Sequence, residues 1–238
     1  MWSAKTVFSS RVSILALALA APAVSLGATV GLATSAVFDE VVAGPDSVYA
    51  GAGSAYLQWG DTQCTTCETY TSYLGFEGPG NLYKPVFEMV ETGSPFLIGT
   101  LSFSNVTRGG DSANVSYAEM LLGLQVQDGV RGDFVFDLNI ANTPDDSNQK
   151  HGVPDVLTVG SNFDSYHFSH AGQVYTLGLL GWSADGGSSF ADLFSVPELE
   201  KIKIGLYAQA QPVPVPAAFW LFGSGLLALA GTVRRRSN

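Results

Sequence analysis

The stretch GDFVFDLNIA at residues 132–141 alternates apolar and polar side chains with a period of two. In an extended chain, residues two apart lie on the same face. One face holds Phe134, Phe136, Leu138 and Ile140, and the other holds Asp133, Asp137 and Asn139. Such alternation is typical of a strand that buries one face, so the stretch predicts a half-buried β-strand.

The same period recurs on both sides of this stretch. Residues 201–208 place three aliphatic side chains opposite Lys201 and Lys203. Further strands are predicted at 48–59, 86–90, 96–103, 121–126, 155–159 and 174–180. Turn-rich segments separate them, and one weak helical pattern spans 191–199, where Pro197 interrupts it. The sequence therefore predicts an all-β fold, an antiparallel two-sheet β-sandwich of jelly-roll type with about eight or nine strands.

The beginning of the chain predicts a secretory signal peptide at residues 1–23. A positive region is followed by an apolar run and then small residues, and cleavage is expected after Ala23 or as late as Gly27. An uncleaved membrane helix is the alternative, although Pro22 and later glycines interrupt the apolar run. The predicted organisation continues with a lead-in at 24–47, the β-sandwich domain at 48–210, a Pro-rich linker and sorting motif at 211–216, a transmembrane helix at 217–233 and a basic cytoplasmic tail at 234–238.

The other end of the chain predicts a membrane anchor. Residues 217–233 are uncharged and mostly apolar, and Arg234, Arg235 and Arg236 follow directly. As a helix this run spans about 25 Å, a little less than the hydrocarbon core of roughly 30 Å. The arginines are expected to stay cytoplasmic, which leaves the body outside. A buried C-terminal core helix is the alternative, but it would not need a terminal run of arginines.

A proline-containing motif precedes this apolar run. It consists of Val213, Pro214, Val215, Pro216 and Ala217, and WLFGSGLL follows at 220–227. This order resembles the PEP-CTERM sorting signals of Gram-negative bacteria in their VPLPA variant, with Val215 where the commonest form has glutamate. The resemblance implies an inner-membrane-anchored precursor that an exosortase, a cysteine transpeptidase-like membrane enzyme, cuts near the motif. The mature protein would then reach the cell surface or the extracellular space.

Several stretches of the body occur in a second recognisable order. They are Trp59-Gly60, PFLIGTLSFSN at 95–105, FVFDLNIANTPDD at 134–146, Asp155-Val156 and YTLGLLGW at 175–182. Their order and spacing resemble the exported choice-of-anchor domains of type K over about 50–210. That family carries one of several alternative C-terminal sorting signals. The resemblance implies location and fold rather than a chemical activity.

The charge of the body limits its partners. Five of the eleven Lys and Arg lie in the two terminal signals, so six remain against all 21 acidic residues and the body carries a net charge of −15. Such a surface repels phosphate backbones, which excludes nucleic acid as a partner. It suits an exported protein, or one that collects cations. The partners expected from the sequence are signal peptidase, exosortase, the membrane and exopolysaccharide.

Cys64 and Cys67 are the only cysteines, in the run TQCTTCET. A lone C-x-x-C pair can form a short disulfide, a redox site or half of a zinc site. Zinc would need further ligands, and the surrounding threonines favour extended chain over the helix that a redox pair opens. We therefore expect a local disulfide in an oxidising compartment, with the redox pair and the metal site as alternatives.

The run NTPDDSNQKHGVPD at 142–155 is the most chemically suggestive loop. Asp145, Asp146, Asn148 and Asp155 supply the oxygen ligands that calcium prefers, although their spacing is not that of an EF-hand. A solvated acidic loop is the alternative. Calcium is therefore the one cofactor that the sequence suggests.

Catalytic patterns are not evident. His151, His167 and His170 lie in no catalytic motif, and His167 and His170 would point to opposite faces of a strand. No motif selects a pair of carboxylates for glycoside hydrolysis. We therefore expect a non-enzymatic structural or adhesive surface protein. The alternatives are a carbohydrate-binding module and, less favoured, a secreted hydrolase. Aromatic candidates for stacking on sugars are Trp59, Tyr73, Tyr83 and Trp182.

Overall fold

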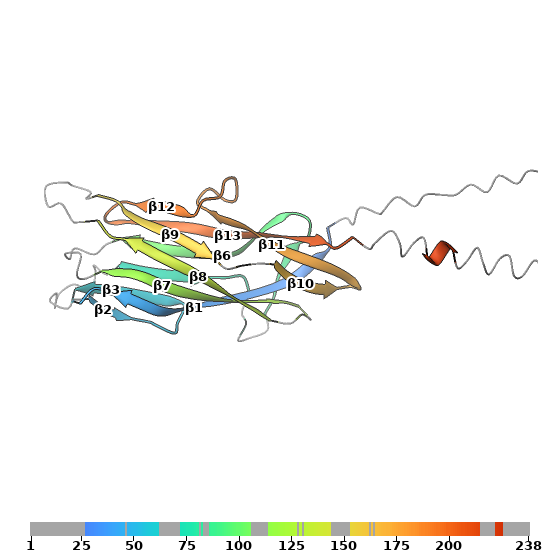
Figure 1. The fold of residues 1–238 in the computed structure, drawn as a ribbon, viewed down its shortest axis with the longest axis horizontal. Coiled ribbons are helices and arrows are strands. Elements are labelled where there is room, and N and C mark those ends of the chain that lie inside the picture. The colour runs from blue at the N-terminus through green and yellow to red at the C-terminus, as the bar shows by residue number, and fades with distance from the viewer. Residues whose placement is uncertain are drawn as a thin grey trace, which may run out of the picture.

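The structure, a computed structural model, describes residues 27–45, 47–61, 72–80, 82, 86–105, 114–127, 129, 131–143, 153–161, 163, 165–214 and 222–225. These residues form thirteen strands in two antiparallel sheets (Figure 1). The six-stranded sheet contains, in spatial order, β12 (Leu193–Val196), β9 (Asp155–Ser161), β8 (Gly132–Ala141), β7 (Val115–Val126), β1 (Thr29–Ala43) and β5 (Glu88–Glu91). The seven-stranded sheet contains β10 (Ser165–His170), β11 (Gln173–Ser183), β13 (Glu200–Pro212), β6 (Pro95–Asn105), β4 (Ser72–Glu77), β3 (Tyr56–Asp61) and β2 (Ser47–Ala50).

The inner faces of both sheets contribute to one hydrophobic core. In β8, Phe136, Leu138 and Ile140 are buried while Asp137 is exposed, which confirms the alternation predicted for 132–141. Phe136 meets Trp182 of the other sheet edge to face, with ring centroids 5.6 Å apart. This arrangement is compatible with a β-sandwich, in which side chains of two facing sheets interdigitate.

The longest strand, β1, lies where the sequence predicts only a lead-in at 24–47. It pairs with β7 on one side and with β5 on the other, and Leu32 and Phe38 are fully buried. The predicted boundary at 48 is therefore wrong, because the sheet begins about twenty residues earlier. Residues 30–34, near the start of β1, are buried on consecutive positions, so this part of the strand lacks the alternation that identifies a half-buried strand.

Two other predicted elements differ from the structure. Residues 48–59, predicted as one strand, form a hairpin of β2 and β3 around Gly51, whose φ of 100° favours glycine. Residues 191–199, predicted as weakly helical, contain the edge strand β12, which pairs with β9. Strands β4 and β10 are additional, which brings the total to thirteen. Predicted strands at 86–90, 96–103, 121–126, 155–159 and 174–180 each overlap an observed one.

The two ends of the folded body lie beside each other. The amide N–H of Thr92 donates to the carbonyl oxygen of Ala28 at 2.8 Å, and that of Gly93 donates to Ala210 at 2.8 Å. The start of β1 and the end of β13 therefore meet at the turn between β5 and β6, at one end of the elongated molecule (Figure 1). The remainder of both sheets extends away from this end.

Several predicted segments lie outside the described residues. They are the signal peptide at 1–23, Cys64 and Cys67, the loop positions Asp145, Asp146 and Asn148, the motif residues Val215, Pro216 and Ala217, and Arg234, Arg235 and Arg236. The predicted transmembrane helix at 217–233 is described only at 222–225. Among the residues with a described placement, no helix is long and apolar enough to span a membrane.

Candidate functional site: a tyrosine and lysine patch

Two tyrosines lie together on the outer face of the seven-stranded sheet. Leu57 in β3 and Leu74 in β4 point into the core, so alternation turns Tyr56 and Tyr73 outward. Their ring centroids are 5.1 Å apart, with 33° between the ring planes. Tyr56 is 44% exposed. The pair therefore presents aromatic surface to solvent.

A glycine creates the space that the Tyr56 ring occupies. Gly75 of β4 lies directly opposite Tyr56 in the strand register, and a Cβ atom there would approach the Tyr56 ring to 3.3 Å. The ring thus lies against the backbone of the neighbouring strand. The surrounding hollow has a volume of about 430 Å³. Its lining consists of Ala55, Tyr56, Tyr73, Gly75, Phe76, Glu77, Ser102, Lys201 and Lys203.

Two lysines from β13 complete the hollow. In the register with β6, Lys201 lies opposite Ser104 and Lys203 lies opposite Ser102, so small side chains separate the lysines from β4. Lys201 Nζ is 4.9 Å from the centroid of the Tyr73 ring, a cation–π distance. We call Tyr56, Tyr73, Lys201 and Lys203 the tyrosine–lysine patch.

The patch concentrates positive charge on an acidic protein. The described part of the chain contains three basic side chains, Arg131, Lys201 and Lys203. Arg131 forms an ion pair with Asp133 at 2.7 Å, and within that part neither lysine forms one. Burial raises the pKa of Tyr56, and Tyr73 adds to this rise while the charge of Lys201 opposes it. The lysine charge therefore acts directly on the aromatic pair.

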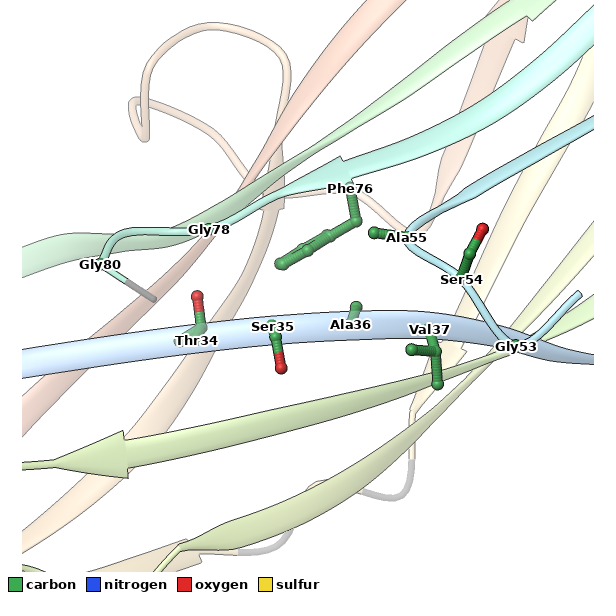
Figure 2. Close-up of a pocket in the computed structure, with 10 residues that line it drawn as sticks. All are labelled: Thr34, Ser35, Ala36, Val37, Gly53, Ser54, Ala55, Phe76, Gly78 and Gly80. Atoms are coloured by element: carbon green, nitrogen blue, oxygen red, sulfur yellow. The ribbon is translucent and has the colours of Figure 1, made fainter. Parts of the chain in front are cut away.

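A second hollow lies at the sheet edge next to the patch (Figure 2). Its volume is about 330 Å³, and it shares Ala55 and Phe76 with the first hollow. Figure 2 shows Thr34 and Ala36 of β1 pointing toward Phe76, while Ser35 and Val37 point the opposite way. We call this space the edge hollow.

Hydrogen bonds hold two of the hydroxyl groups that line the edge hollow. Thr34 Oγ1 donates to the carbonyl oxygen of Ile98 at 2.8 Å, and the Ser54 hydroxyl lies 2.7 Å from the carbonyl oxygen of Gly51. A Cβ atom at Gly78 would lie 1.9 Å from Thr34 Oγ1, so glycine permits the close approach of the two sheets here. Among the described residues that line this hollow, none carries a charged side chain. Gly78 and the hydrogen bonds of Thr34 and Ser54 therefore account for the close packing of the two sheets at this edge.

A group of three carboxylates lies on the outer face of the other sheet. Asp39, Glu119 and Asp137 are cross-strand neighbours on β1, β7 and β8. Burial raises the pKa of Glu119, and Glu40, Asp137 and Asp39 raise it further. Like charges placed directly opposite each other destabilise a sheet. None of these carboxylates lines the two hollows described above.

The structure separates the aromatic residues that the sequence offers for sugar stacking. Trp59 and Trp182 are each only 2% exposed and belong to the core, so the idea that they form a binding surface is wrong. Tyr73 lies in the patch. Tyr83 falls outside the described residues. The core tryptophans follow the general rule that a large aromatic in a strand contributes mainly to packing.

Asp155, the one described member of the predicted calcium set, has a structural contact. Its side chain is 4% exposed, and Oδ1 accepts a hydrogen bond from the amide N–H of Thr143 at 2.8 Å. The Thr143 hydroxyl donates to the carbonyl oxygen of Val153. These bonds join the two sides of the loop at its base. Among the described residues, no group of three His, Cys, Asp or Glu side chains is arranged to hold a metal ion.

The described histidines lie in β10. The strand buries Tyr166 and Phe168 and exposes His167, so His167 and His170 fall on opposite faces, as the sequence predicts. His167 Nδ1 is 3.0 Å from the Thr176 hydroxyl of the neighbouring strand. His151 lies outside the described residues.

Sequence reasoning did not select Tyr56, Lys201 or Lys203 as site residues. The alternation at 201–208 does place both lysines on the polar face of a strand. It does not reveal that β6 and β4 lie between these lysines and Tyr56. The site is therefore visible only once the strand order is known. Comparison of the chain with models of known protein families and with curated proteins found no match.

Proposed function

We propose that this protein is an exported, non-catalytic protein of the cell surface or extracellular matrix that binds polysaccharide through the tyrosine–lysine patch. The observation that carries the proposal is the outward-facing pair of Tyr56 and Tyr73, 5.1 Å apart beside Lys201. Sugar rings present apolar C–H faces and polar edges. An aromatic ring offers a flat apolar face for the first, and lysine ammonium groups donate hydrogen bonds to the second.

Tyr56 is the stacking ring in this proposal. Lys201 lies over the ring of Tyr73, which leaves Tyr56 as the more accessible of the two. Tyr73 holds both Tyr56 and Lys201 by direct contact, so it acts as a positioning residue. Aromatic side chains bring large contact area at low cost in conformational entropy, which favours them as centres of binding surfaces.

The carboxylates favour binding over hydrolysis. Glycoside hydrolysis commonly uses two carboxyl groups that flank the scissile bond. Among the described residues that line the hollow beside Tyr56, Glu77 is the only carboxylate. A secreted hydrolase is therefore the less favoured alternative, and no cofactor is assigned to the patch.

The predicted ends of the chain supply the location in this proposal. Signal peptidase would remove residues 1–23, and the segment at 217–233 with Arg234, Arg235 and Arg236 would anchor an inner-membrane precursor. The resemblance of the tail to PEP-CTERM signals adds an exosortase as a partner. The body would be a β-sandwich of jelly-roll type related to choice-of-anchor domains, and exopolysaccharide would be its ligand.

The proposal is tested by electrophoresis of the full chain, in a non-ionic detergent, through native gels cast with a soluble polysaccharide. The probes are polygalacturonate, alginate, hydroxyethylcellulose and dextran. At least one should retard the wild-type protein, and Tyr56→Ala should weaken that binding at least about tenfold in Kd, or about 1.4 kcal/mol.

Tyr49→Ala is the matched control. Tyr49 is also 44% exposed and lies in the same sheet, but it does not line the hollow. It should bind like the wild type. Equal loss in both variants, or no retardation by any of the four polymers, would contradict the proposal.

A further inference from the structure

We propose that the polysaccharide bound by the patch is acidic, and that its carboxylate groups bind Lys201 and Lys203. This inference rests on the proposed function and names the chemical class of its ligand. It starts from the position of the two lysines, which are two residues apart on β13 and point to the same outer face. Both line the hollow that contains the tyrosines.

The charge of the protein makes these lysines unusual. The body carries 21 acidic residues, yet Lys201 and Lys203 form no ion pair within the described part of the chain. Arg131, the other described basic side chain, is paired with Asp133. Two neighbouring ammonium groups repel each other, and an anionic ligand would relieve this repulsion. The patch is thus complementary in charge to a polyanion.

Contacts already hold the lysine charge beside the stacking surface. Lys201 Nζ lies 4.9 Å from the centroid of the Tyr73 ring, and Lys203 of the same strand is paired with Ser102 and also lines the hollow. A sugar stacked on Tyr56 would therefore have its polar edge beside ammonium groups. A neutral sugar offers only hydroxyls there, whereas a carboxylate forms the stronger charge-assisted hydrogen bond.

The aromatic surface continues on the other side of the lysines. Tyr207 follows Lys203 on the same face of β13, and a Cβ atom at Gly205 between them would lie 2.7 Å from the Tyr207 ring. Tyr207 therefore extends over Gly205 toward Lys203. Phe190 packs against Tyr207 edge to face, with centroids 6.2 Å apart. Aromatic groups on both sides of a cationic centre fit a polymer chain better than a single sugar.

A nucleic acid would also be polyanionic. However, its affinity depends on many phosphate contacts with basic side chains. Here the described outer face of the sheet offers two lysines on a body of net charge −15. An acidic polysaccharide would not need as many charge contacts as a nucleic acid. Two lysine contacts would be enough, because stacking of its sugar rings on the tyrosines adds to the binding.

The experiment compares polymers that differ only in their carboxylates. Polygalacturonate and alginate are each tested beside their carboxyl-reduced forms, in which a hydroxymethyl group replaces every carboxylate. In native gels of the full chain, the acidic form of at least one polymer should bind at least about tenfold more tightly than its reduced form.

Lys203→Gln and Arg131→Gln each lose one positive charge, so comparing them shows where on the protein the acidic polymer binds. Lys203→Gln should lose at least about fivefold in affinity for the acidic polymer, and Lys203→Arg should retain it. Arg131→Gln removes the same charge just before β8 of the other sheet and should bind like the wild type, although its partner Asp133 is released. Equal binding of acidic and reduced polymers through Tyr56 would overturn the acidic ligand and leave polysaccharide binding intact. Equal losses in Lys203→Gln and Arg131→Gln would also overturn it, and failure of every polymer to bind would overturn both proposals.

Discussion

At the scale of single residues, the absence of a side chain decides how tightly the seven-stranded sheet packs. A Cβ atom at Gly99 of β6 would lie 2.1 Å from Cζ of Phe76, which is buried. A Cβ atom added at Gly178 of β11 would have no other atom within 4 Å. We predict that Gly99→Ala lowers the free energy of unfolding by about 1–3 kcal/mol through overpacking.

Gly178→Ala is the control in the same sheet and should change stability by less than about 0.5 kcal/mol. Chemical denaturation followed by tryptophan fluorescence measures both variants. If the two proved equally stable, the Phe76 ring would not occupy the space beside Gly99.

A second residue-scale prediction concerns Tyr117 in β7. The Tyr117 hydroxyl donates a hydrogen bond to Asp137 at 2.7 Å, and this bond, with burial and nearby carboxylates, raises the pKa of Tyr117 to about 12. The folded protein thus holds the phenolic proton more tightly than the unfolded chain, where the pKa is 10.0. Its contribution to stability is complete below pH 10 and is lost as the pH rises toward about 12.

Tyr117→Phe lacks this group, so its stability should fall less steeply between pH 10 and about pH 12 than that of the wild type. Urea denaturation at several pH values measures the difference. Parallel pH profiles for the two proteins would show that the hydrogen bond to Asp137 does not control this ionisation.

At the scale of elements, β1 is the first strand of the folded body and contributes side chains to the hydrophobic core. Phe38 is fully buried in this strand, whereas Val42 is 55% exposed. We predict that Phe38→Ala lowers the free energy of unfolding by about 3–5 kcal/mol, because it leaves a cavity between the sheets. Val42→Ala on the same strand should have an effect below about 0.5 kcal/mol. Denaturant titration compares the two variants. A small effect of Phe38→Ala would indicate that residues 24–47 are a lead-in segment and not part of the core.

At the scale of the whole molecule, the two ends of the folded body meet at one end and the patch lies toward the other. Lys203 precedes Pro212 by nine residues on β13, so about 30 Å of extended chain separates it from the start of the tail. Figure 1 shows β13 running along the length of the molecule toward this end. An anchored precursor would therefore hold the patch away from the membrane.

The fate of the tail is the prediction at this scale. If 213–236 is a sorting signal, the extracellular form should lack the apolar segment at 217–233, because cleavage occurs near 214–217. Intact-mass analysis of extracellular and membrane fractions measures this loss. Replacing Arg234, Arg235 and Arg236 by Ser should disturb orientation or processing, since it removes the cytoplasmic positive charge. If cells that express an exosortase yield only protein with the full tail, the sorting hypothesis is contradicted. The membrane-anchor hypothesis would remain.

The sequence by itself determined the class of fold. Alternation at 132–141 and 201–208 depends on which side chains each strand buries, and that property is local, so β8 and β13 were predictable. The same local rule failed for β1, since residues 30–34 in its first part are buried on both faces. It also missed β12, because four residues are too few to establish a period, and the strand is defined by its pairing with β9.

Only the tertiary structure decided where the candidate site lies. Tyr56, Tyr73 and Lys201 are far apart in sequence, and they meet because β3, β4, β6 and β13 are neighbours in one sheet. It also decided that Trp59 and Trp182 belong to the core while Tyr56 faces solvent. Periodicity specifies the two faces of each strand, but strand order arises from nonlocal pairing and packing. A surface built from several strands therefore cannot be deduced from any one of them.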